Sequence, residues 1–258
     1  MLAITLVTAA VILAWLGPLA LRPFSARAAV RLRAKEMHLW ARAVLAIVNL
    51  RLTVVGDPPP RPCFLVANHL SYLDIPVFWS AVECTFLAKS EIARWPLLGP
   101  LTRASGTLYI ERERRAAVAP AIDAVRARLA LGESVMVFPE GGSSPGAAIQ
   151  PFRSSLFAAA EAADGRAWTA AISYDTGNPA APAHLRVAWW GDMTFPDHLW
   201  RLVQIPRIHA RLHFGAQPVV ASDRKKLARA AHSACTGLFT PTAPGIAPAP
   251  ALDPSPAA

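Results

Sequence analysis

Short apolar runs alternate with amphipathic segments through the middle of the chain, and this alternation limits the possible folds more than any other feature. Phe64–Ala67, residues 107–110 and residues 135–138 are short apolar runs of the kind that form buried strands. Residues 116–130 instead place apolar side chains at helical spacing among alanines and arginines. Strands that alternate with helices predict an α/β domain with a mixed sheet flanked by helices.

Further segments complete this pattern and divide the chain. Helices are predicted over 75–81, 156–163 and 224–238, and strands over 169–174 and 185–190. Residues 58–60 are all proline and mark a linker, because proline fits neither a helix interior nor a central strand. From Thr240 the chain is rich in Pro and Ala, which predicts disorder. The predicted organisation is membrane-binding helices over 1–55, an α/β domain over 56–239 and a disordered tail over 240–258.

The first 21 residues contain no charged side chain. A membrane-spanning helix needs roughly 20 apolar residues, so this segment qualifies by length, with a kink or end expected at Pro18. A second apolar stretch over residues 37–50 is predicted to lie on or dip into the same bilayer. By the positive-inside rule, the basic residues after the first segment predict an inner (cytoplasmic) membrane location with the α/β domain on the cytoplasmic side. These residues are Arg22, Arg27, Arg31, Arg33 and Lys35. A buried core helix over 1–21 remains an alternative.

The chain is basic, with 26 lysines and arginines against 17 acidic residues and a formal net charge of +9. A basic surface suits anionic partners, and without a basic motif interleaved with aromatic residues we expect membrane lipids rather than nucleic acid. The three cysteines form no CxxC pair. His209 and His213 have helical metal-ligand spacing, but Pro206 and Gly215 leave little room for a helix. We therefore expect no metal and no cofactor.

His69 and Asp74 directly follow the predicted strand Phe64–Ala67. On one helix, residues five apart point about 140° away from each other, so the two side chains can meet only if the helix starts after His69. Ser71 is a suitable N-cap, with Asp74 three residues later in capping-box register. A carboxylate turned back in this way can hold one tautomer of the histidine and leave the other nitrogen to accept a proton. The alternative is that Asp74 only caps a helix and His69 only packs.

Four sequence blocks occur in a fixed order. They are Asn68-His69 with Asp74, the segment 88–99, the segment 106–112 ending in Arg112, and the segment 137–141, which reads V-F-P-E-G. Together they resemble the motifs of the lysophosphatidic acid acyltransferase (PlsC-like glycerolipid acyltransferase) family, in the order that the family has them. The resemblance covers roughly residues 37–175, and four motifs in order are far more specific than one.

The resemblance implies an O-acyltransferase that moves a fatty acyl group from acyl carrier protein or acyl-CoA to the hydroxyl of a lysolipid. His69 would be the general base and Asp74 its orienting partner. Arg112 would pair with an anionic head group, because a guanidinium binds phosphate bidentately; a solvated role among its charged neighbours is the alternative. The predicted substrate-binding residues are Asn68, Ser71, Lys89, Gly106, Arg112, Pro139, Glu140, Gly141 and Arg153.

The third motif departs from the family pattern. The family commonly continues with Thr-Arg-Ser after F-P-E-G, whereas residues 142–146 here read G-S-S-P-G, and the nearest cation is Arg153. This version is similar to the lyso-ornithine lipid acyltransferase branch, whose acceptor carries an amino-acid head group. The acceptor that we expect first is 1-acyl-sn-glycerol-3-phosphate, with lyso-ornithine lipid as the alternative.

Two other classes of function remain to be compared. Residues 142–146 match the G-x-S-x-G pattern of serine hydrolases at Ser144, but residues 139–142 separate it from the strand and Pro145 follows it, unlike a nucleophile elbow. A non-catalytic, membrane-associated lipid-binding protein with the same fold is the third possibility, because a fold does not determine function.

Overall fold

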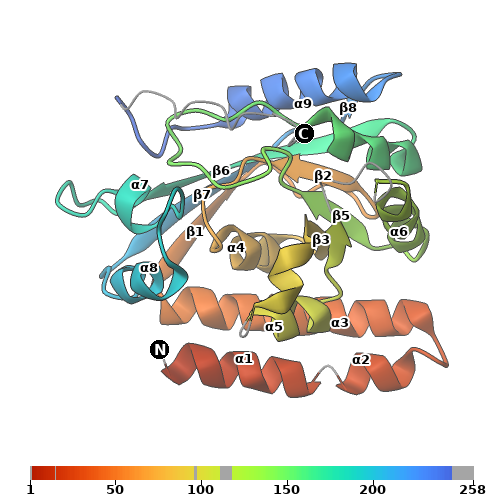
Figure 1. The fold of residues 1–258 in the computed structure, drawn as a ribbon, viewed down its shortest axis with the longest axis horizontal. Helices are drawn as coiled ribbons and strands as arrows, with labels where there is room; N and C mark the ends of the chain where they lie inside the picture. Colours follow the sequence, from red (N-terminus) through yellow and green to blue (C-terminus); the bar gives the residue numbers. More distant parts are fainter. Residues whose placement is uncertain (1, 15, 96–97, 111–117, 246–258) are drawn as a thin grey trace, which may run out of the picture.

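The computed structural model describes residues 2–14, 16–95, 98–110 and 118–245. Within these residues eight strands form one sheet (Figure 1). Seven follow the order β1 (Leu50–Val55), β7 (Ile208–Phe214), β6 (Arg166–Asp175), β2 (Phe64–Ala67), β5 (Ser134–Val137), β3 (Cys84–Lys89) and β4 (Leu108–Ile110), and β8 (Val219–Val220) pairs with β6. Strands β6, β2, β5, β3 and β4 run parallel to one another. Strand β7 is antiparallel to β6, and β1 is parallel to β7. The sheet is therefore mixed, as predicted.

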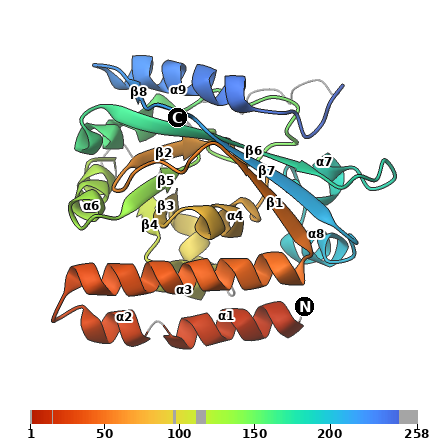
Figure 2. The ribbon, with the colours of Figure 1, turned by 180° about the vertical axis from the view of Figure 1, so that it is seen from behind.

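Helices cover both faces of the sheet (Figures 1 and 2). One face carries α3 (Ala26–Ile47), α4 (Asp74–Ala81) and α5 (Leu98–Ala104), with the short 3₁₀ helix η1 (Ser90–Arg94) after β3. The other carries α6 (Val118–Ala130), the 3₁₀ helix η3 (Ser154–Ala163) and α9 (Arg224–Leu238). The short helices α7 (Ala183–Arg186) and α8 (Phe195–Leu202) lie at one end of the molecule.

Alternating side chains of the central strands supply two separate cores. In β2, Phe64 and Val66 pack with the α6 and α9 layer, whereas Leu65 packs with the α3 and α4 layer. In β5, Val135 and Met136 divide between the faces in the same way. Because successive residues of a strand point to opposite faces, a strand covered on both sides must be apolar throughout. This explains the unbroken apolar runs of the sequence.

The apolar amino terminus forms α1 (Leu2–Ala14) and α2 (Leu16–Leu21), which run alongside α3 on its outer side (Figures 1 and 2). Residues 3–21 form the one segment of the described chain that is long and apolar enough to cross a membrane, with a mean hydropathy of 2.2 in its most apolar window, of which 18% is buried. Such exposure does not fit a buried core helix. The Nε1–H of Trp40 on α3 donates to Oγ1 of Thr8 at 3.1 Å and ties α1 to the domain.

The structure differs from the prediction at several places, and one is β1, which falls within the predicted membrane-binding helices over 1–55 but is a strand of the sheet. Helix α3 begins at Ala26, where Ser25 caps it, so it includes the basic flank as well as the apolar stretch. The predicted strand over 185–190 is wrong: α7 ends at Arg186, and the buried apolar residues that follow belong to a loop. The start of the tail is packed at Thr242 and Ala243, which are buried and whose N–H groups both donate to the carbonyl of Gly146. Residues 246–258 lie outside the described residues.

Candidate active site

A histidine and an aspartate meet where strand β2 ends and helix α4 begins. Asp74 is the first residue of α4, and its Oδ2 lies 2.7 Å from Nδ1 of His69. The same oxygen accepts hydrogen bonds from the backbone N–H groups of Leu70 at 2.7 Å and Ser71 at 3.1 Å. Asp74 is completely buried, whereas 22% of the His69 side chain is exposed. The loop thus directs one ring nitrogen at a buried carboxylate and leaves part of the ring accessible.

Local backbone geometry produces this contact much as the spacing predicts. The Asp74 carboxylate reaches back to the N–H of Ser71, which is the expected half of the capping box. Ser71 itself is not the N-cap, because the helix starts later, with Leu73 in that position and no side-chain cap. The hydroxyl of Ser71 instead accepts from the N–H of Leu73 at 3.3 Å. Ser71 is buried and supports the loop.

The ring of His69 is fixed on its flat side as well as at its edge. It stacks on Phe138, with ring centroids 4.2 Å apart and planes 10° from parallel. Since Nδ1 is bonded to the carboxylate, Nε2 is the nitrogen that can accept a proton. Among the residues that the structure describes, Nε2 has no hydrogen-bond partner. The arrangement matches that of a general base held in one orientation.

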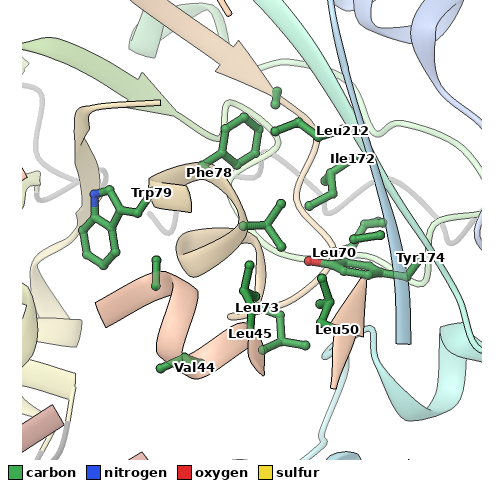
Figure 3. Close-up of a cluster of buried hydrophobic side chains, with 14 of the residues drawn as sticks. Val44, Leu45, Leu50, Leu70, Leu73, Phe78, Trp79, Ile172, Tyr174 and Leu212 are labelled. Atoms are coloured by element: carbon green, nitrogen blue, oxygen red, sulfur yellow. The ribbon is translucent and has the colours of Figure 1, made fainter. Parts of the chain in front are cut away.

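Tyr174 on β6 is a third member of the cluster that the sequence reasoning missed. Its hydroxyl donates to Oδ1 of Asp74 at 2.7 Å. Figure 3 shows the Tyr174 side chain beside Leu70, with the hydroxyl directed away from β6. Burial raises the pKa of Tyr174 well above its usual range, and the Asp74 charge adds to this, so the hydroxyl remains a donor. No local pattern in the sequence indicates a contact between residues 74 and 174.

Glu140 contacts the loop that carries His69. Its Oε1 accepts from the backbone N–H of His69 at 2.6 Å, and its Oε2 accepts from the N–H of Gln150 at 2.8 Å. Burial raises the pKa of Glu140 to about 8, against the lowering effect of these two hydrogen bonds. Glu140 therefore joins the third motif to the loop that carries His69.

Asn68 fixes the same loop to strand β6. Its Nδ2 donates to the carbonyl of Ile172 at 2.9 Å, and its Oδ1 accepts from the N–H of Ile172 at 2.8 Å. The side chain thereby replaces a missing backbone pair at the point where β2 ends. Because Asn68 is buried, these contacts make it a support for the position of His69.

The predicted residues of the third motif gather around one turn. The N–H of Arg153 donates to the carbonyl of Pro139 at 2.9 Å. Gly141 has a φ of +88°, and a Cβ there would lie 2.5 Å from Nε of Arg153. Only glycine suits this position, because the backbone is left-handed and the guanidinium lies directly over it. Arg153 is half-buried and places a cation beside the Gly141 backbone of the third motif.

The remaining predicted residues lie elsewhere. Lys89 is exposed at the carboxyl end of β3, on the same edge of the sheet as His69. Gly106 lies before the amino end of β4, at the opposite edge, where a Cβ would be 2.7 Å from the guanidinium carbon of Arg33. The structure therefore does not bring Gly106 to His69. Arg112 lies outside the described residues.

An apolar cavity of about 190 Å³ adjoins His69. It lies among α1, α3, α4, α5 and α8, and Tyr72 and Trp189 line it near the histidine. Side chains that line it from these helices are Ile4, Thr8, Trp40, Val44, Ile75, Trp79, Leu101, Phe195 and Leu199. An apolar cavity of this kind beside the histidine suits a fatty acyl chain, and the amino-terminal helix α1 forms part of its wall.

Ser144 does not have the surroundings of a hydrolase nucleophile. Its N–H donates to the carbonyl of His69 at 3.0 Å, but its buried Oγ has no hydrogen-bond partner among the described residues. It lies in a loop well after β5 rather than in a tight turn between strand and helix. The geometry therefore gives the hydrolase hypothesis no support.

Known proteins share both the sequence motifs and the fold. Residues 51–173 match the family model named Acyltransferase. A lyso-ornithine lipid O-acyltransferase of Rhizobium meliloti is 34% identical over 187 residues, which cover 68% of this chain and 64% of that protein. A 1-acyl-sn-glycerol-3-phosphate acyltransferase of Neisseria meningitidis is 33% identical over 177 residues, which cover 67% of this chain and 68% of that protein.

A solved structure shows the same architecture. The crystal structure of the 1-acyl-sn-glycerophosphate acyltransferase PlsC from Thermotoga maritima matches with a TM-score of 0.62 at 22% identity and covers 92% of this chain and 94% of that one. The fold is thus that of a glycerolipid acyltransferase. The chain belongs to the PlsC-like acyltransferase family, of the lysophosphatidic acid type, and the predicted family is confirmed.

Proposed function

We propose that this protein transfers a fatty acyl group from a thioester to the hydroxyl of a lysolipid, with His69 as the general base. One observation carries the proposal: Nε2 of a histidine held by a buried carboxylate adjoins an apolar cavity. Nε2 takes the proton of the lysolipid hydroxyl, and the oxygen attacks the thioester carbonyl carbon. The C–S bond then breaks, and the thiolate leaves with the proton from the imidazolium. An ester and a free thiol result, without an acyl-enzyme.

Asp74 would act in this scheme by stabilising the charge that His69 acquires. Its Oδ2 accepts three N–H donors, so the carboxylate cannot turn away from the ring. Tyr174 holds the other oxygen and, as a permanent donor, leaves the proton on the histidine. This matches the role of a buried carboxylate beside a catalytic histidine.

The acceptor that we propose first is 1-acyl-sn-glycerol-3-phosphate, with lyso-ornithine lipid as the second candidate. Arg153 supports an anionic head group, because its guanidinium lies over the Glu140–Gly141 turn next to the catalytic loop. A guanidinium pairs with phosphate or carboxylate. The small polar third motif favours lyso-ornithine lipid, and relatives carry both names.

A purified-enzyme assay tests the function and the acceptor together. Wild type, His69→Ala and His209→Ala are incubated with acyl-CoA and each of the two lysolipids, and ester formation is measured. His209 is an exposed histidine on β7 and serves as the matched control. We expect His69→Ala to lose at least about a thousandfold in rate with the preferred acceptor and His209→Ala to keep it. Full activity of His69→Ala would refute the proposal.

The donor is proposed to be acyl carrier protein or acyl-CoA. Lys89 is exposed at the same edge of the sheet as His69, and the chain has a net charge of +9. Both features suit an acidic carrier protein or a phosphorylated thioester. If acyl carrier protein binds a basic surface, raising salt from 50 to 300 mM should weaken its use more than that of acyl-CoA. Equal salt dependence for both donors would contradict a dedicated carrier surface.

We propose that α1 and α2 lie in the cytoplasmic leaflet of the inner membrane rather than across it. They run alongside α3, which packs on the sheet, and they expose Leu6, Leu13, Leu16 and Leu19. In intact cells, a membrane-impermeant maleimide in the periplasm should then label neither Ala3→Cys nor Phe24→Cys. The three native cysteines are buried and should give little background labelling. Periplasmic labelling of Ala3→Cys would show that the helix spans.

A further inference from the structure

A second pocket, of about 390 Å³, lies between α2, α3 and α6. Four arginine side chains line it, and the apolar helix α2 contributes to its wall. The residues that define it are Arg22, Arg33, Arg103, Arg128, Pro18 and Leu19. We call it the arginine pocket. It is lined by none of the residues assigned to the active site except Gly106, whose backbone it includes.

The arginine pocket is separate from the catalytic centre. Glu133, which binds its arginines, directly precedes β5, whereas Phe138, which stacks on His69, directly follows that strand. Five residues of strand span about 16 Å, so the pocket lies at the opposite edge of the sheet from His69. In Figures 1 and 2, α2 and α6 share one end of the molecule and α8 lies at the other.

Positive charge in the pocket exceeds the negative charge that faces it. Arg33 bonds both oxygens of Glu133 at 2.8 Å, and Arg128 bonds the same carboxylate at 3.2 Å. One carboxylate is thus shared by two guanidinium groups. Glu36, one turn along α3, does not line the pocket, although it is close enough to Arg33 for that charge to lower its pKa against the larger raising effect of burial. Burial lowers the pKa of the Arg128 guanidinium, and the nearby charges of Arg33 and Arg22 lower it further although Glu133 opposes them.

Arg22 and Arg103 are the accessible cations of the pocket. Both are exposed, and Arg103 donates one N–H to the carbonyl of Ala93 at 2.6 Å. In the described part of the chain the Arg22 guanidinium has no hydrogen-bond or ion-pair partner. Next to Arg22, Leu19 and Leu21 of α2 are exposed, and Phe24 is 87% exposed. A cationic pocket bordered by apolar side chains presents head-group and acyl-chain contacts together.

We infer that the arginine pocket binds the phosphate head group of an anionic phospholipid whose acyl chains lie along α2. The lipid is a bound component of the membrane and not the acyl acceptor, because the pocket lies at the far edge of the sheet. The inference rests on the proposed position of α2 in the leaflet, but the binding test below needs neither a bilayer nor activity. A guanidinium group pairs with phosphate through two N–H donors. The phosphate of a zwitterionic lipid already lies next to the cation of its own head group, so it should pair with the arginines less strongly.

The test uses the full chain in nonionic detergent, with dioctanoyl phosphatidylglycerol and dioctanoyl phosphatidylcholine as soluble probes, and measures bound lipid by native mass spectrometry. We expect phosphatidylglycerol to bind at least about tenfold more tightly than phosphatidylcholine. Arg22→Gln should lose most of this preference, and Arg22→Lys should keep part of it. Arg31→Gln is the matched control, because Arg31 is exposed on α3 with the same charge but does not line the pocket.

Three results would overturn the inference. Equal binding of the two lipids would mean that the pocket does not select an anionic head group. Equal loss in Arg22→Gln and Arg31→Gln would reduce the effect to net charge. Displacement of phosphatidylglycerol by 3′,5′-ADP would mean that the arginines bind the nucleotide part of the thioester donor instead. Each outcome is independent of whether His69→Ala abolishes acyl transfer.

Discussion

Replacing Asp74 by Asn separates the charge of this residue from its hydrogen bonds. The amide oxygen can still accept from the N–H groups of Leu70 and Ser71, so the loop keeps its shape, and the amide NH2 group then donates to the Tyr174 hydroxyl, which donates to Asp74 in the wild type. What disappears is the negative charge beside the imidazolium of His69. The N–O distance of 2.7 Å places the charge centres about 4 Å apart, which corresponds to about 4 kcal/mol at an effective dielectric constant of about 20. A loss of that size lowers kcat by about a thousandfold.

Steady-state acyl transfer by Asp74→Asn, measured alongside wild type and Asp57→Asn, tests this reasoning. Asp57 is an exposed aspartate of the linker and should tolerate the change without loss of kcat. KM for both substrates should change little, because the carboxylate is buried and contacts neither. Thermal unfolding checks that the variant is folded. A folded Asp74→Asn protein that retains more than about a tenth of the wild-type kcat would refute the assignment of the charge to the chemical step.

Three further predictions follow from named contacts. Burial raises the pKa of Glu140 to about 8, so the folded state holds a proton that the unfolded state releases near pH 4.5, and stability should fall as pH rises from about 5 to 8. Glu140→Gln should flatten the slope of Tm against pH, and equal slopes for the variant and wild type would contradict this prediction. Arg153→Gln should raise KM for the acceptor about tenfold or more while leaving KM for the donor unchanged, and equal changes in both would argue against head-group binding. Thr8→Val removes the acceptor of the Trp40 indole N–H, which should destabilise the contact between α1 and α3 by about 1–3 kcal/mol. The variant should also have a raised KM for long-chain acyl donors, which a series of donors of increasing chain length would measure.

The parts of the site that could be predicted from sequence are those fixed by local geometry. The His69–Asp74 contact depends on the six residues between β2 and α4, and capping rules describe that turn well. Tyr174 reaches the same carboxylate from a strand a hundred residues later. No local periodicity encodes such a contact, since strand order in the sheet creates it. The pairing of Asn68 with Ile172 escapes sequence reasoning for the same reason.

The missed elements of the fold have physical reasons of their own. Strand β7 alternates buried and exposed side chains from Ile208 to Phe214, a period-two pattern that is present in the sequence. The helical spacing of His209 and His213 hides this alternation, because the two histidines lie on the same side of a strand. Residues 185–190 look like a strand because they are apolar and aromatic, but Val187 and Ala188 are buried as part of a loop whose Trp189 N–H donates to Leu70. Burial and strand formation are distinct properties.

The proposed placement of α1 in the leaflet would connect the membrane to the cavity beside His69. Ile4 and Thr8 of α1 line the same cavity as His69, while the outer side of α1 exposes leucines such as Leu6. If α1 lies in the leaflet, the apolar cavity is continuous with the region that holds acyl chains, and a chain can reach the histidine without crossing water. Transfer of each methylene into water would cost about 0.8 kcal/mol, so a water-filled path would oppose entry of a long chain strongly. With the proposed placement, α1 would be both membrane contact and cavity wall, which would explain why an apolar segment with an exposed outer side is packed against the α/β domain.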